Sequence, residues 1–135
     1  QSGMMLLLNL LATILIWWSP LEVIEKPIAQ IEPVISAISM GSSSELARFF
    51  NPSISLNING QQGDYSKNQA ELVLREFFKK NPPSEFSLVF KNENPTSHST
   101  YIGEYVTDIG MYKVFIKAAQ VDSNLKIYSL DFVKT

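Results

Sequence analysis

Hydrophobic and polar residues follow one another along this chain in patterns that predict helices first and mostly strands afterwards. Between positions 25 and 39, isoleucines recur at steps of three and four residues: Ile28, Ile31, Ile35 and Ile38. This spacing places them on one buried face of a helix. Pro33 removes an internal hydrogen-bond donor, so it is expected either to kink this helix or to start it anew. Gly41 is expected to end it.

A short second helix and a hairpin are predicted next. The serines at positions 42–44, followed by Glu45, are typical of a helix N-terminus, and Asn51-Pro52 is expected to stop the helix. Apolar residues then alternate with polar ones, as in a half-buried strand: Ile54, Leu56 and Ile58. Asn59-Gly60 tolerates positive φ, so the chain is expected to turn back there toward Tyr65.

The clearest predicted helix runs from position 66 to position 81. Ser66 and Gln69 have the spacing of a capping box, in which each side chain accepts a hydrogen bond from the other residue's backbone. A broad apolar face follows: Ala70, Leu72, Val73, Leu74, Phe77 and Phe78. Asn81-Pro82-Pro83 then stops the helix.

The rest of the chain is predicted to form strands joined by short turns. Four segments have β-prone or alternating residues: 86–90, 101–107, 111–119 and 125–133. The separators between them are rich in Asn, Asp, Gly and Ser, and they are short enough to require antiparallel neighbours. The order α-α-β-β-α-β-β-β-β therefore predicts an α+β fold with helices on a curved antiparallel sheet, as a single domain over positions 25–135.

The N-terminal block is the most apolar part of the chain. Positions 4–18 read MMLLLNLLATILIWW, an uncharged run that is short for a membrane span but matches the core of a signal peptide. We therefore interpret positions 1–24 as an export signal, or as a membrane anchor if retained, and expect an exported, periplasmic or envelope-associated protein. The alternative is a buried or partner-binding helix, since paired tryptophans suit an interface.

Charge and cysteine content exclude several classes of function. The formal net charge is −2, so no broad basic surface is available for nucleic acid, which we do not expect as a partner. The chain has no cysteine, which excludes disulfides and thiolate metal sites. Its single histidine leaves no zinc or iron cluster to propose, and no phosphate-binding or dinucleotide glycine motif is present, so no cofactor is expected.

Three stretches resemble a family of uncharacterised exported proteins of Gram-negative bacteria. They are Ser44–Phe50, Tyr65–Pro83, and Ile102-Gly103 taken with Gly110–Val114. The domain of that family is of unknown function and has the nuclear-transport-factor-two-like, or cystatin-like, cone fold. The resemblance implies a cone whose mouth lies between the helices and the sheet, where this superfamily often has a pocket. It also implies homodimerisation through the outer face of the sheet, and no known reaction.

Acid–base chemistry has few candidates in this sequence. Enzymes with the cone fold commonly pair a carboxylate with a histidine or a tyrosine. The only histidine, His98, falls in a polar stretch that we interpret as a solvated loop. Glu104 and Asp131 sit in predicted strands, and each points into the cone in one of two registers.

Aromatic residues offer a second kind of site. Tyr105 and Tyr112 flank the turn at positions 108–110, and their hydroxyls could orient a ligand in an apolar pocket, although core packing explains most aromatics equally well. We expect a non-enzymatic domain that binds a small apolar ligand or a protein partner, with Tyr105, Tyr112, Glu104 and Asp131 as pocket candidates. The alternative is a small isomerase- or hydrolase-like enzyme that uses a cone carboxylate and a tyrosine.

Overall fold

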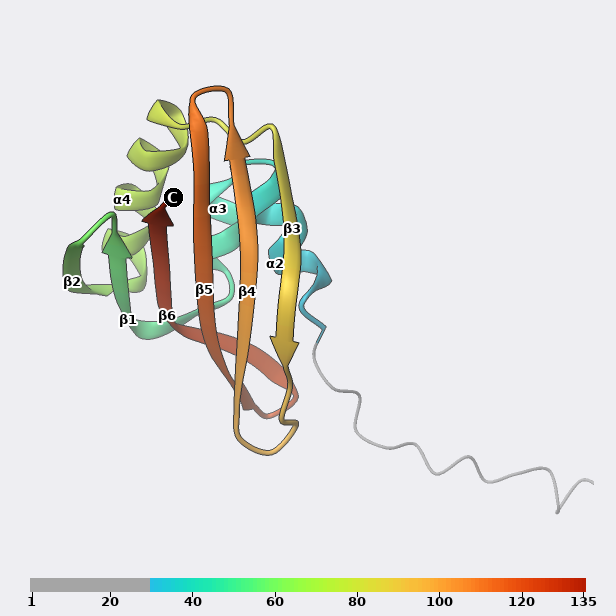
Figure 1. The fold of residues 1–135 in the computed structure, drawn as a ribbon. Helices are drawn as coiled ribbons and strands as arrows, with labels where there is room; N and C mark the ends of the chain where they lie inside the picture. Colours follow the sequence, from blue (N-terminus) through green and yellow to red (C-terminus); the bar gives the residue numbers. More distant parts are fainter. Residues whose placement is uncertain (1–29) are drawn as a thin grey trace, which may run out of the picture.

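The computed structural model describes residues 30–135, which form three helices and a six-stranded sheet (Figure 1). The helices are α2 (Glu32–Ser39), α3 (Ser43–Ala47) and α4 (Lys67–Lys80). The strands are β1 (Phe50–Ile58), β2 (Gln61–Ser66), β3 (Glu85–Asn92), β4 (His98–Thr107), β5 (Gly110–Val121) and β6 (Asn124–Lys134). The predicted export signal or anchor lies outside the described residues. Within positions 30–135, no helix is both long and apolar enough to span a bilayer.

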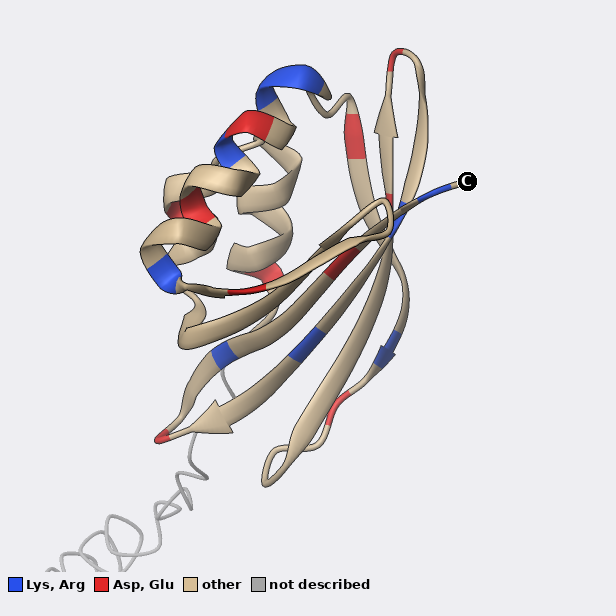
Figure 2. Cartoon of the chain, turned by 90° about the vertical axis from the view of Figure 1, so that its left-hand side faces the viewer, with Lys and Arg blue, Asp and Glu red and all other residues tan. Residues whose placement is uncertain are grey.

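The sheet has the strand order β2-β1-β6-β5-β4-β3, and the helices cover one of its faces (Figure 2). Strands joined by a short turn pair antiparallel, as such turns require. On its other side, β1 pairs in parallel with β6 from the other end of the domain. Helix α4 connects β2 at one edge of the sheet to β3 at the other. The predicted α+β class and element order are confirmed, whereas the expected antiparallel sheet is corrected to a mixed, mostly antiparallel one, because β1 and β6 run parallel.

Pro33 lies at the start of helix α2, one of the two outcomes that the sequence left open. The helix starts at Glu32 and has Pro33 in its first turn, where a missing N–H costs no hydrogen bond. Of the predicted buried stripe, Ile31 and Ile38 are buried as expected, Ile35 is only half-buried, and Ile28 lies outside the described residues. Val34, which the stripe did not include, is fully buried. Gly41 ends the helix with φ of 65°, and its N–H bonds to the Ile38 carbonyl at 3.0 Å.

Helix α4 begins where β2 ends, at a single serine. The Ser66 hydroxyl accepts from the Gln69 N–H, and the Gln69 side chain accepts from the Ser66 N–H, each at 3.3 Å. The predicted capping box is therefore confirmed. Four residues of α4 are buried against the sheet and the other helices: Ala70, Leu74, Phe77 and Phe78.

Burial alternates along the central strands and defines an inner and an outer face of the sheet. In β4, Tyr101, Gly103 and Tyr105 are buried on the inner face under the helices, and the residues between them are half-exposed on the outer face. Strands β5 and β6 alternate in the same way, apart from one irregularity in their pairing. The core therefore lies between this inner face and the three helices.

Candidate functional site

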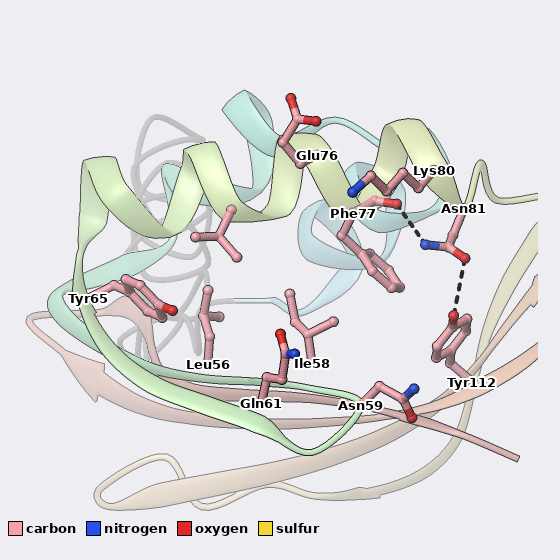
Figure 3. Close-up of a pocket in the computed structure, with 11 residues that line it drawn as sticks. Leu56, Ile58, Asn59, Gln61, Tyr65, Glu76, Phe77, Lys80, Asn81 and Tyr112 are labelled. Atoms are coloured by element: carbon pink, nitrogen blue, oxygen red, sulfur yellow. Dashed lines mark hydrogen bonds between the residues drawn. The ribbon is translucent and has the colours of Figure 1, made fainter.

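A hollow of about 400 Å³ opens between α4 and the β1–β2 hairpin (Figure 3). Its lining comes from two regions that are adjacent in space, namely the hairpin with its turn and the second half of α4, with one further residue from β5. The lining residues are Leu56, Ile58, Asn59, Gln61, Tyr65, Val73, Glu76, Phe77, Lys80, Asn81 and Tyr112. A hollow of this size suits a small ligand.

The floor of the hollow is apolar. Leu56 and Ile58 lie two positions apart on β1, so both side chains point from the same face of the strand toward α4 (Figure 3). Val73 and Phe77 lie four positions apart on α4 and therefore share its lower face. The alternation of side chains along β1 and the helical periodicity of α4 thus place these four apolar side chains on one surface.

Tyr65 forms one end wall because its neighbour two positions earlier is a glycine. A Cβ atom on Gly63 would lie 2.8 Å from the Tyr65 ring, which is closer than side chains tolerate. The ring can therefore lie along β2 only because position 63 has no side chain. Tyr112 stands at the opposite end of the hollow (Figure 3).

The tight turn of the hairpin supplies the polar rim. Asn59 and Gly60 have φ of 51° and 91°, the left-handed pair that a two-residue hairpin turn requires. The Asn59 N–H donates to the Phe132 carbonyl at 2.8 Å, which ties the turn to β6. Asn59 and Gln61 are held at the mouth of the hollow as a result. On α4, Glu76 and Lys80 add one negative and one positive charge to the same rim.

Asn81 takes part in three hydrogen bonds at the inner end of the hollow, through its side chain and its backbone carbonyl. Its side-chain Nδ2 donates to the Phe77 carbonyl at 3.1 Å, and its Oδ1 accepts from the Tyr112 hydroxyl at 3.1 Å. Its own backbone carbonyl accepts from the Tyr105 hydroxyl. Two tyrosines from neighbouring strands are thereby joined to the residue that ends α4.

Tyr105 lies deeper than the hollow, inside an aromatic cluster. Its ring centroid is 5.7 Å from that of Phe132 and 5.8 Å from that of Phe77. Burial raises the pKa of the Tyr105 hydroxyl above its ordinary value, and the neighbouring Tyr112 adds to that increase. The hydroxyl therefore stays protonated and acts as a structural donor.

The family model for a domain of unknown function, DUF4783, matches residues 31–133. The chain belongs to the DUF4783 family. A crystal structure of a DUF4783 protein from Bacteroides ovatus is similar, with a TM-score of 0.75, 26% identity, and coverage of 81% of this chain and 98% of that chain. No curated protein matches the sequence of this DUF4783 chain.

More distant structures place this DUF4783 domain in a wider fold group. One is an NTF-2-like protein of unknown function from Silicibacter pomeroyi, with a TM-score of 0.58, 13% identity, and coverage of 78% of this chain and 89% of that chain. Another is a domain of unknown function with a cystatin-like fold from Nostoc punctiforme, with a TM-score of 0.61, 12% identity, and coverage of 77% and 72%. They confirm the nuclear-transport-factor-two-like, or cystatin-like, fold that the resemblance implied.

Of the four pocket candidates in this DUF4783 domain, the structure brings two together. Tyr112 lines the hollow, and Tyr105 lies behind it, with both hydroxyls on Asn81. Glu104 and Asp131 lie on the outer face of the sheet, in β4 and β6. The residues directly before and after each of them are buried on the inner face, and side chains alternate between faces along a strand. The register thus separates the two carboxylates from the hollow.

The two outer carboxylates have their own surroundings. The Glu104 Oε1 lies 3.6 Å from the Lys113 Nζ in the adjacent strand, as a partly exposed ion pair. Asp131 stands opposite Phe115 in the ladder. Burial raises the pKa of Asp131, and the positive charge of Lys117 opposes that increase.

His98 is the first residue of β4 rather than part of a loop, which corrects the sequence interpretation. It is exposed, as expected, and its ring centroid lies 5.3 Å from that of Tyr128. Across residues 30–135, no three His, Asp or Glu side chains are grouped so that they could hold a metal ion.

Sequence reasoning identified Asn81 only as a helix stop and Asn59 only as a turn residue, so their place at the hollow was missed. The turn pattern does carry a signal, because a two-residue hairpin turn puts the residues on either side of it at one end of the sheet. What no local pattern reveals is that this end of the hairpin lies beside the C-terminal half of α4.

Proposed function

We propose that this DUF4783 domain is a non-enzymatic binding module that takes a small ligand into the hollow between α4 and the β1–β2 hairpin. The observation that carries the proposal is a concave site of about 400 Å³ with an apolar floor and a polar rim. This combination is typical of ligand sites, in which apolar surface provides affinity and a few polar groups fix orientation.

The polar rim supports the proposal because several of its side chains have nothing to bind within the domain. Among residues 30–135, the side chains of Asn59, Gln61 and Lys80 make no hydrogen bond or ion pair. They surround the apolar floor formed by Leu56 and Val73. A ligand that lies on the floor would bring its polar atoms within reach of these groups.

The alternative, an enzyme that uses a cone carboxylate with a tyrosine, finds no support in the two carboxylates that the sequence suggested. Glu104 and Asp131 lie on the outer face, across the sheet from the Tyr112 hydroxyl. General acid–base catalysis needs the proton-transferring group within hydrogen-bond reach of the reacting atom. Neither of these two carboxylates can therefore transfer a proton to a ligand in the hollow.

The test is binding of N-phenyl-1-naphthylamine, an uncharged dye that fluoresces strongly in apolar surroundings. The 135-residue protein is expected to give a saturable increase in fluorescence. Val73→Trp is expected to weaken binding by roughly tenfold or more, because the added indole occupies space in the hollow that the dye needs. Leu72→Trp is the matched control, since Leu72 is the exposed neighbour on α4 and does not line the hollow.

Two results would contradict the proposal. One is the absence of saturable dye binding to a folded wild-type protein. The other is equal binding by Val73→Trp and Leu72→Trp, which would place the dye elsewhere on the surface.

A further inference from the structure

The hydrogen bonds around Asn81 determine which way the Tyr112 hydroxyl points. The Phe77 carbonyl can only accept, so the Asn81 atom facing it at 3.1 Å must be the amide nitrogen. The amide oxygen then faces Tyr112, and the hydroxyl must donate its proton to that oxygen. If the Asn81 amide were rotated by 180°, its oxygen would face the Phe77 carbonyl oxygen. Both atoms can only accept, so the hydrogen bond to Phe77 would be lost.

Asn81 has little freedom to change this arrangement. Its backbone N–H donates to the Phe77 carbonyl at 2.9 Å, and its backbone carbonyl accepts from the buried Tyr105 hydroxyl. Tyr112 is held by an edge-to-face contact with Phe77, at 5.2 Å between ring centroids and 83° between planes. The two partners are thus positioned by separate contacts.

Tyr112 is 6% exposed and lines the inner end of the hollow, and its hydroxyl oxygen, having given its proton to Asn81, keeps lone pairs that can accept. Within the described part of the chain, no side chain donates to this oxygen. A hydroxyl oxygen that has given away its proton can still accept a hydrogen bond. The Tyr112 oxygen at the inner end of the hollow can therefore accept a hydrogen bond from a donor group of a ligand.

We infer that the hollow selects an uncharged small molecule with an apolar body and a hydrogen-bond donor, such as a hydroxyl or an amide N–H, that reaches Tyr112. The inference rests on the proposed function and specifies its ligand class. The apolar body matches the floor of Leu56, Val73 and Phe77. The rim carries Glu76 and Lys80 with opposite charges, so it offers no net charge to favour an ion.

The experiment measures displacement of N-phenyl-1-naphthylamine from the full 135-residue protein by two naphthalenes of similar size. The first, 2-naphthol, carries a donor, whereas 2-methoxynaphthalene carries an oxygen that can only accept. The ratio of the two naphthalenes' dissociation constants is measured for wild type and for Tyr112→Phe. Comparing the two ratios cancels the difference in hydrophobicity between the naphthalenes.

The preference of the wild-type protein for 2-naphthol over 2-methoxynaphthalene should be roughly threefold to tenfold larger than that of Tyr112→Phe. This difference corresponds to one ordinary hydrogen bond. Tyr101→Phe is the matched control, because it removes a buried phenol hydroxyl that bonds to Glu93, outside the Asn81 network and away from the lining of the hollow. It is expected to keep the wild-type ratio. Retention of that ratio also shows that losing a phenol does not by itself distort the site.

The outcomes separate the inference from the proposed function. If the dye binds at the Val73-sensitive site but the ratio is the same in wild type and Tyr112→Phe, the donor inference is wrong and the binding function stands. Failure of both naphthalenes to displace a dye that does bind there would also overturn the inference. If the dye itself shows no saturable binding, the proposed function fails.

Discussion

Gly103 shows how one missing side chain shapes the sheet. In β4 it lies beneath the ring of Phe86 from β3, and a Cβ atom at this position would be 2.5 Å from two ring atoms. The same Cβ atom would also lie 3.1 Å from the Ser87 carbonyl oxygen. Backbone and ring both confine the space, so the glycine is needed for the ring to cover the strand.

At this residue scale, Gly103→Ala is expected to lower the free energy of unfolding by roughly 1–3 kcal/mol, because an overpacked site must shift the ring or the strand. Urea denaturation would measure the loss. Gly110→Ala is the control, since its Cβ atom would come no closer than 3.6 Å to the flexible side chain of Lys134. Equal stability of the two variants would contradict the packing argument.

Helix α4 is the element that both closes the core and builds the hollow. Its N-cap is Ser66, the last residue of β2, and its C-cap is Asn81. Between these points it provides Val73 and Phe77 to the floor. The position of the site therefore depends on how well the ends of this helix are held.

At the scale of the element, Ser66→Ala is expected to destabilise the domain by about 1 kcal/mol, because it leaves an N-terminal amide of α4 without its acceptor. Denaturation gives the magnitude, and hydrogen exchange at the Gln69 amide locates the effect. Ser87→Ala is the matched control, an exposed serine in β3 outside any cap. A loss at Ser66 no larger than at Ser87 would argue against the capping box.

Two buried phenols of β4 donate hydrogen bonds to groups outside their own strand. The Tyr101 hydroxyl donates to the Glu93 carboxylate at 2.8 Å, in the connection between β3 and β4. The Tyr105 hydroxyl donates to Asn81 at the end of α4. Burial, assisted by the Glu93 carboxylate, raises the pKa of Tyr101 to about 12, and burial also raises that of Tyr105.

These shifts predict a pH dependence of stability for the whole domain. Both folded-state pKa values exceed that of an unfolded tyrosine, so the folded state holds its phenol protons more tightly. The contribution is fully present below about pH 10, the unfolded pKa, and is lost as pH rises toward the folded values. Urea midpoints measured from pH 8 to pH 12 should therefore fall above pH 10.

Tyr101→Phe should make this alkaline decline shallower. Each protein is compared with its own midpoint at pH 8, which separates the titration from the hydrogen bond that the substitution removes. A decline of unchanged steepness in the variant would show that Tyr101 does not contribute to it.

Local chemistry made much of the fold predictable. Ser66 and Gln69 satisfy each other's backbone groups within one turn, so α4 could be located from residues three positions apart. The hairpin turn at Asn59-Gly60 was equally readable, because few residues accept left-handed φ. In contrast, the parallel pairing of β1 with β6 joins residues 74 to 77 positions apart, such as Phe50 and Ile127, and no short-range pattern encodes it.

The amino-acid sequence alone predicts the element order, the capped helix and the alternation of the strands, because each follows from interactions among near neighbours. It places Glu104 and Tyr105 on opposite faces of β4. It does not specify which face is buried, because the same alternating strand can be paired in two registers that bury opposite faces. Only the tertiary structure placed Tyr105 inside and brought it and Tyr112 together on Asn81. That convergence depends on packing α4 against the sheet, a long-range event that local residue patterns do not specify.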